Sequence, residues 1–99
     1  MERRKYDISP IIVNGFKVSK VIIDPHVDKH SDHIDDELIL ELIKKLDNER
    51  VEPESIKDGF RYHASNLSHN SSFYKLIWLL EDSYLYIGVV TAYKDRRLK

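Results

Sequence analysis

The chain has 99 residues, a length that indicates one domain with a modest hydrophobic core. Its hydrophobic fraction of 41% and charged fraction of 33% are typical of a globular protein, and the absence of cysteine excludes disulfides and thiolate chemistry. No run of about eighteen apolar residues predicts a membrane span, and the first residues lead into no secretory signal, so we expect a cytosolic protein.

Charge is distributed unevenly along the chain. Residues 1–23 have five basic and two acidic side chains (+3), residues 24–58 have five and twelve (−7), and residues 59–99 have six and three (+3), giving −1 in total. The two terminal parts are therefore expected to form a cationic surface. A pI near 6.5 argues against strong non-specific binding to nucleic acid, but it leaves room for a small basic cleft.

The N-terminal region is predicted to be a β-hairpin. Asn14-Gly15 tolerates the positive φ angles of a type I′ turn, and β-prone residues flank it on both sides. The second strand continues to Ile23 and ends at Asp24-Pro25, because proline lacks the N–H that the ladder needs.

The polar stretch 26–35 is expected to contain a short helical turn, followed by the main helix over residues 36–47. Asp35 is the predicted N-cap, Ile34 and Ile39 are placed to form a hydrophobic staple, and Asn48 ends the helix. Apolar residues recur at helical spacing along the segment, namely Leu38, Ile39, Leu42, Ile43 and Leu46.

Three further strands are predicted, over residues 59–64, 73–80 and 84–93, with a polar loop at 65–71 and a charged tail at 94–99. The fold class is therefore α+β, a single domain over 1–99. We expect an antiparallel sheet of about five strands with one main helix packed on one face, in the order ββ-α-βββ. The residues predicted to be mostly buried are Leu38, Leu42, Ile43, Leu46, Leu76, Trp78, Ile87 and Val89.

Three short motifs carry a resemblance to a known family. They are Lys29-His30-Ser31-Asp32-His33-Ile34-Asp35-Asp36-Glu37, Tyr74-Lys75-Leu76-Ile77-Trp78, and Val89-Val90-Thr91-Ala92-Tyr93-Lys94-Asp95-Arg96-Arg97. Over residues 28–97 the chain resembles the RelE/ParE superfamily of toxins, and within it the BrnT-like branch. It departs from that pattern in its near-neutral charge and in having His33 where an arginine is common.

The resemblance implies a RelE-like domain that cleaves RNA, including RNA on the ribosome, without a metal or other cofactor, and that an antitoxin or immunity protein neutralises. It implies no membrane association. Metal-independent cleavage needs a base for the 2′-hydroxyl proton, cations for the phosphorane and an acid for the leaving oxygen. Three elements supply candidates for this chemistry: Lys29 and His30, Arg61 and His63, and Tyr93. The candidate RNA-binding residues are Arg96, Arg97 and Lys75.

A working site would require His30, Arg61 and Tyr93 to converge on one concave surface beside the sheet, with Lys29, Arg96 or Arg97 near it. The alternative for Arg61 and His63 is a place on a solvated face. His26, His30 and His33 have the spacing of zinc ligands if they are helical, but Pro25 makes a long helix unfavourable there, so no bound metal is expected.

Three functions remain open from the residues themselves. The leading one is the endoribonuclease toxin; the second is a non-catalytic module that binds a partner through a sheet edge or the helix face; the third is a metal-binding protein that uses the 26–33 histidines. Tyr84, Tyr86 and Tyr93 are also candidates for stacking bases on the sheet.

Overall fold

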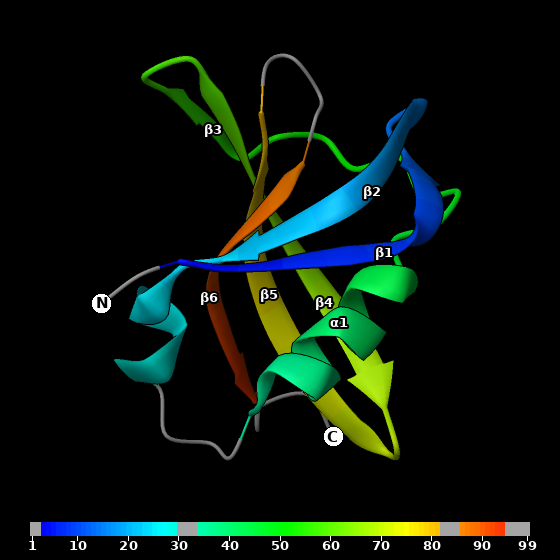
Figure 1. Cartoon of the computed structure of the whole chain (residues 1–99), viewed down its shortest axis with the longest axis vertical. Coiled ribbons are helices and arrows are strands. Elements are labelled where there is room, and N and C mark those ends of the chain that lie inside the picture. The colour runs from blue at the N-terminus through cyan, green and yellow to red at the C-terminus, as the bar shows by residue number, and fades with distance from the viewer. Residues whose placement is uncertain (1–2, 30–33, 82–85, 95–99) are drawn as a thin grey trace.

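The structure, a computed structural model, describes residues 3–29, 34–81 and 86–94. Its elements in chain order are β1 (Arg4–Val13), β2 (Phe16–Ile23), the 3-10 helix η1 (Pro25–Lys29), α1 (Asp36–Lys44), β3 (Ser55–Lys57), β4 (Phe60–His69), β5 (Ser72–Leu80) and β6 (Ile87–Lys94). The strands form one six-stranded sheet in the order β1-β2-β6-β5-β4-β3 (Figure 1).

The predicted α+β class, with one main helix on a sheet, is confirmed, but two details of the sheet differ from the prediction. The sheet has six strands where about five were expected, so the element order is ββ-α-ββββ. It is also mixed, because β2 pairs with β6 in parallel while the other neighbours are antiparallel. The parallel pairing joins strands that are far apart in the sequence. No local turn signal predicts such a pairing, because none connects the two strands directly.

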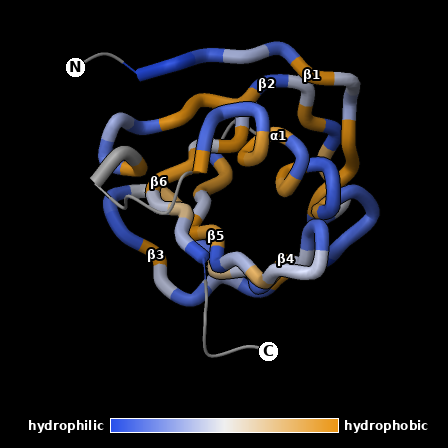
Figure 2. Tube along the Cα trace, turned by 90° about the horizontal axis from the view of Figure 1, so that it is seen from below, coloured by the Kyte–Doolittle hydropathy of each residue, from blue (hydrophilic) through white to orange (hydrophobic). Residues whose placement is uncertain are grey.

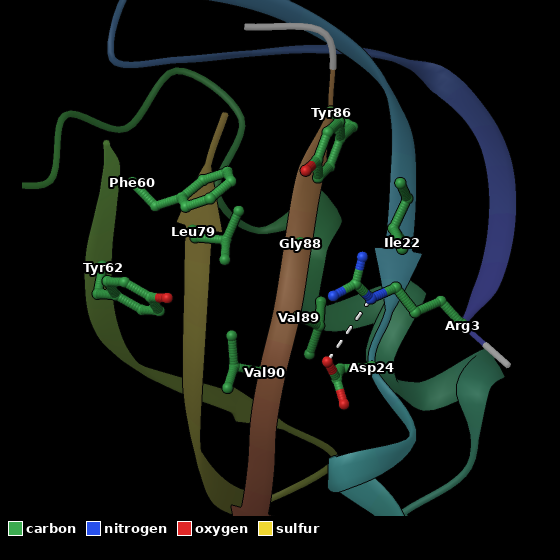
Figure 3. Close-up of a pocket in the computed structure, with 10 residues that line it drawn as sticks. All are labelled: Arg3, Ile22, Asp24, Phe60, Tyr62, Leu79, Tyr86, Gly88, Val89 and Val90. Atoms are coloured by element: carbon green, nitrogen blue, oxygen red, sulfur yellow. Dashed lines mark ion pairs between the residues drawn. The ribbon is translucent and has the colours of Figure 1, made fainter. Parts of the chain in front are cut away.

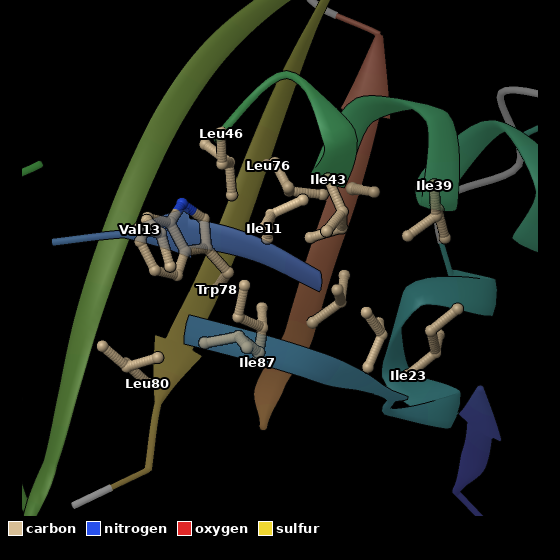
Figure 4. Packing of buried hydrophobic residues seen from close by; sticks show 14 of the residues in the cluster. Ile11, Val13, Ile23, Ile39, Ile43, Leu46, Leu76, Trp78, Leu80 and Ile87 are labelled. Atoms are coloured by element: carbon tan, nitrogen blue, oxygen red, sulfur yellow. The ribbon is translucent and has the colours of Figure 1, made fainter. Parts of the chain in front are cut away.

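The sheet is strongly curved, and α1 lies against its inner side. Seen end-on, the strands follow one another around an open ring that holds the helix (Figure 2). The core fills the space between the helix and the inner face, and it brings together buried residues of β1, β2, α1, β5 and β6 (Figure 4). Trp78 is the largest of these side chains and is fully buried.

The N-terminal hairpin forms as predicted. Asn14 and Gly15 both have positive φ angles, 53° and 81°, as a type I′ turn requires. The Asn14 side chain has a second structural role, because its Oδ1 accepts a hydrogen bond from the Val51 N–H (2.6 Å) and its Nδ2 donates one to the Val51 carbonyl (3.0 Å). This pair of bonds ties the hairpin tip to the segment that follows α1.

The helix begins where the sequence predicts it and ends sooner. Asp35 is the N-cap, since its side chain accepts a hydrogen bond from the Leu38 N–H (2.8 Å). The α-helix ends at Lys44, and the chain continues in turns to Asn48, whose φ of 65° ends the helical direction. Of the residues predicted to be buried, Leu38 alone is half-buried, because the buried stripe of α1 runs through its neighbour Ile39.

The predicted polar loop at 65–71 is wrong. Residues 65–69 continue β4, and the turn consists of Asn70 and Ser71, with φ angles of 48° and 66°. Polar residues suit this strand because it is only half-buried. On its inner face, the Ser65 hydroxyl accepts a hydrogen bond from the Trp78 indole N–H (3.0 Å).

Two other boundaries differ from the prediction. The short strand β3 was missed, although its Asp58-Gly59 turn to β4, with φ angles of 54° and 82°, is a common hairpin signal. The last strand begins at Ile87 rather than at residue 84 and includes Lys94, which was assigned to the tail. Residues 84–85 and 95–99 of those two predictions lie outside the described residues.

An ion pair links the first strand to the start of α1. The Asp36 carboxylate accepts hydrogen bonds from Arg4 Nε (2.7 Å) and Nη2 (2.9 Å), and from the Tyr6 hydroxyl. Burial alone would raise the pKa of the Asp36 carboxyl, but the hydrogen bonds from Arg4 and Tyr6 and the charge of Arg4 together lower it below its usual value. The same carboxylate raises the pKa of Tyr6.

This arrangement predicts a pH-dependent effect of Asp36→Asn. A lowered carboxyl pKa stabilises the fold above the ordinary carboxyl pKa, and the contribution is lost as the pH falls through the lower, folded-state pKa. Because the pair is partly exposed, we expect the substitution to lower the free energy of unfolding at pH 7 by only about 1 kcal/mol.

Urea unfolding at pH 7 and at pH 3 measures this effect. The difference between wild type and Asp36→Asn should shrink at pH 3, and Glu37→Gln, which removes the adjacent exposed carboxylate, should have little effect at either pH. A difference of equal size at both pH values would contradict the assignment.

Candidate functional site

The parallel pairing of β2 with β6 decides which predicted site segments meet. Val21 pairs with Ile87 and Ile23 with Val89, so both strands run toward the same end of the sheet. The chain that leaves β2 forms η1, which packs against β6 and ends at Lys29. Lys29 is thus the last residue of an element that packs against β6, the strand that contains Tyr93.

Several of the predicted site residues fall outside the described residues. They are His30, Arg96 and Arg97. His30 follows Lys29 in the sequence, and the two arginines follow the last residue of β6.

Tyr93 and Lys75 lie side by side on the outer face of the sheet. They are direct cross-strand partners on β6 and β5, and the neighbours of each, Ala92 and Leu76, point into the core. Since side chains alternate between the two faces of a strand, Tyr93 and Lys75 point outward together. Both are half-buried. The predicted catalytic tyrosine and one predicted RNA-binding lysine are therefore neighbours.

Arg61 and His63 lie elsewhere. They pair with Leu80 and Trp78, two buried residues, so they occupy the inner face of the sheet. Leu80 and Lys75 are five residues apart on β5, which separates Arg61 from the level of Tyr93 by roughly 17 Å along the strand direction. The expectation that Arg61 and Tyr93 converge on one surface is wrong, and so is the alternative that His63 is solvated.

The outer face of the sheet holds a groove of about 190 Å³ (Figure 3). Phe60, Tyr62 and Tyr86 contribute aromatic rings around it, and the Arg3–Asp24 ion pair, with Nε and Oδ2 3.8 Å apart, lies at its edge. Gly88 lies in its floor and is closely packed, since an added Cβ would lie 3.0 Å from Leu79 Cγ. The sequence predicted Tyr86 as a base-stacking candidate. It did not predict Phe60 and Tyr62, the other two aromatic residues of the groove.

A weakly basic region adjoins this groove. A second hollow, of about 390 Å³, shares Ile22 and Tyr86 with the groove. Its charged lining residues are Lys5, Lys20 and Asp7, a net charge of +1. The outer face therefore combines aromatic rings with the side chains of Arg3, Lys5 and Lys20. These three cations belong to the N-terminal part of the chain, which carries a net charge of +3.

The inner face holds a third hollow, of about 310 Å³, lined by Arg50, Glu52, Arg61 and His63 among others. His63 is 1% exposed, and its ring stacks on that of Trp78, with centroids 4.2 Å apart and planes inclined by 13°. Burial lowers the pKa of His63, against the opposing influence of the backbone of Glu52 and Val51. Burial therefore favours the neutral form of the ring.

The residues proposed as zinc ligands are described only in part, since His30 and His33 lie outside the described residues. Elsewhere, within residues 3–29, 34–81 and 86–94, no three histidine or carboxylate side chains gather in a group that would hold a metal ion. No helix in these ranges combines the length and apolar character needed to cross a membrane.

Comparisons with known proteins give no relative: no protein-family model matches the chain, and neither a curated protein nor a solved structure matches it.

Proposed function

We propose that this domain is a metal-independent endoribonuclease of the RelE-like type, whose site lies where the end of β6 meets the segment that follows β2. The observation that supports the proposal is the parallel pairing of β2 with β6. It directs two segments distant in sequence, each with residues suited to RNA cleavage, toward the same end of the sheet.

The proposed chemistry assigns a role to the candidate residues of these two segments. We assign His30 as the general base that takes the 2′-hydroxyl proton, so that the 2′-oxygen attacks the phosphorus, since an imidazole accepts a proton near neutral pH. Lys29, Arg96 and Arg97 supply positive charge to the phosphorane, and the Tyr93 hydroxyl donates a proton to the leaving 5′-oxygen. Arg61 has no part in this site. It lies on β4 opposite Leu80, so it points to the inner face and is far along the strands from Tyr93.

The outer face of the sheet provides the proposed path for the RNA strand. Aromatic rings stack bases with little regard to sequence, and cations beside them bind the phosphates. The aromatic groove around Gly88 and the Tyr93–Lys75 pair lie on this same face, at different levels of β6. We propose that a single strand runs from the groove to the cleavage site along β6.

RNA cleavage by the purified domain in EDTA tests the proposal. Wild type should cleave single-stranded RNA, and His30→Ala should reduce the rate by about a hundredfold or more, the usual loss for a general acid or base. His69→Ala, which removes a histidine at the end of β4, is the matched control and should retain full activity.

Expression should also slow bacterial growth, and His30→Ala should relieve the effect while the protein remains folded. Intact RNA in the presence of folded wild-type protein would reject the proposal. Equal losses in His30→Ala and His69→Ala would also reject the assigned role of His30.

The RNA path predicts a binding defect in Gly88→Val. The larger side chain fills the floor of the groove, since even a Cβ there would lie 3.0 Å from Leu79 Cγ. Stacking on a protein ring contributes about 1–3 kcal/mol per base, so we expect affinity for a single-stranded RNA to fall by roughly tenfold.

Fluorescence anisotropy with labelled RNA measures this affinity. Ala64→Val adds a branched side chain on the same face, away from the groove, and should bind as wild type does. Unchanged affinity in Gly88→Val would place the RNA elsewhere.

A second candidate function, the non-catalytic interaction module, is favoured by the edge strand β3. All three residues of β3 are exposed, and Ile56 is 69% exposed, an unusual place for a large apolar side chain. A strand of a partner protein would pair with this edge and cover Ile56. In the toxin proposal, the neutralising partner would use the same edge; if the domain leaves RNA intact, partner binding would be its function.

A further inference from the structure

The hollow above His63 is a separate feature of the domain, at the opposite end of the sheet from Tyr93. It lies between the tip of the β1–β2 hairpin, the segment that follows α1, and the start of β4. Its volume of about 310 Å³ accommodates a small molecule, and its lining includes two arginines, a glutamate and a histidine. The proposed ribonuclease mechanism uses none of these residues.

His63 is the feature that points to a ligand. The side chain is 1% exposed, and in the part of the chain that the structure describes neither Nδ1 nor Nε2 has a hydrogen-bond partner. Buried polar groups in folded proteins are normally paired, because an unpaired donor or acceptor lowers stability. The ring lines the hollow, so a molecule in that space is placed to satisfy it.

The packing around His63 accounts for its fixed position. The backbone of Val51 and Glu52 lies close enough to influence the pKa of the ring, but it forms no hydrogen bond with either nitrogen. One face of the ring stacks on Trp78, whose indole N–H is already donated to Ser65. The Asn14 amide, which also lines the hollow, likewise has both polar atoms bonded to Val51. Among these side chains, the His63 imidazole is the one whose nitrogens lack a partner within the described residues.

The charges around the hollow select the class of ligand. Arg50 and Arg61 contribute two positive charges and Glu52 one negative charge, which leaves a net charge of +1. Arg50 lies exposed at the rim, with its Nη2 3.7 Å from the position that a Cβ on Gly15 would occupy. Guanidinium groups bind oxyanions through paired N–H donors, and a neutral imidazole adds one donor and one acceptor.

We propose that this hollow is a binding site for a small phosphate-class oxyanion, held by Arg50 and Arg61 at the rim and by the His63 ring at the base. A phosphate monoester suits the site particularly well, since it offers oxygens to both arginines and a hydroxyl or oxyanion to the imidazole. The inference is independent of the ribonuclease proposal, because the two sites share no residue.

Thermal unfolding with inorganic phosphate or phenyl phosphate, at constant ionic strength, tests the site. A ligand that binds only the folded state raises the unfolding temperature with its concentration. Wild type should show this shift, and Arg50→Ala should weaken the affinity by about tenfold or more. Lys44→Ala, which removes an exposed cation of α1 that lines none of the three hollows, is the control and should respond as wild type does.

A second variant tests the base of the hollow. His63→Phe retains a flat ring to stack on Trp78 and removes both unpaired nitrogens, so the protein should remain folded and lose the response to phosphate. In wild type, the His63 ring signals in NMR spectra should move on titration with phosphate. No stabilisation of wild type by either probe, or equal responses from Arg50→Ala and Lys44→Ala, would overturn the proposal; a response to inorganic phosphate but not to phenyl phosphate would limit the site to the free ion.

Discussion

Replacing Trp78 with alanine should lower the free energy of unfolding by about 3–5 kcal/mol, the usual range for a buried tryptophan. The indole is fully buried on β5 at the centre of the core. Its loss leaves a cavity, unpairs the Ser65 hydroxyl and removes the surface on which His63 stacks. A domain of this size has a total stability of about 5–15 kcal/mol, so the variant should be near the limit of folding.

Urea unfolding followed by circular dichroism measures this change. Trp78→Phe is the control, because it keeps an aromatic ring beneath His63 and loses the hydrogen bond to Ser65; it should cost clearly less than Trp78→Ala. If Trp78→Ala unfolds with the midpoint of wild type, the indole is not in the core as described.

The second large effect is expected in α1, where Ile43→Ala should lower the free energy of unfolding by about 2–5 kcal/mol. Ile43 is fully buried within the hydrophobic cluster between the helix and the sheet. Leu38→Ala is a matched change on the same helix at a half-buried position, and it should cost less. Isoleucine has a slightly lower helix propensity than leucine, so propensity alone would make Ile43→Ala the milder change, and a larger loss there reports burial.

Chemical denaturation of the two variants distinguishes the buried stripe from its flank. Equal losses, or a larger loss in Leu38→Ala, would mean that the helix is rotated relative to the arrangement described here.

Local signals in the sequence predicted the elements that local physics determines. Asn14-Gly15 specifies its turn through backbone conformation alone, and Asp35 caps the helix with its own side chain. The predicted loop at residues 65–71 is wrong because polar side chains alone do not indicate irregular structure. Pairing with β5 makes that segment a strand, and Ser65 satisfies the indole N–H of Trp78 within it.

Pairing between distant strands determines which residues come together at the proposed site. No single segment of the sequence contains the information for that pairing. The parallel contact of β2 with β6 joins residues more than sixty positions apart, and it brings η1 onto β6. The burial of His63 also depends on non-local pairing. In the sequence, His63 lies in a segment where polar and apolar residues alternate, which is equally compatible with a surface position. Only the register that places it opposite Trp78 shows that it is buried.

Titration of the labelled domain with a short single-stranded RNA, followed by amide and side-chain NMR signals, tests most directly where RNA binds. The proposed function predicts that signals of Tyr93, Lys75 and Lys29 shift, together with those of the aromatic groove around Gly88. Signals of Arg50 and Ile56 should remain in place. Shifts confined to the His63 hollow, or no shifts at all at concentrations where anisotropy reports binding of a control RNA-binding domain, would contradict the proposed site.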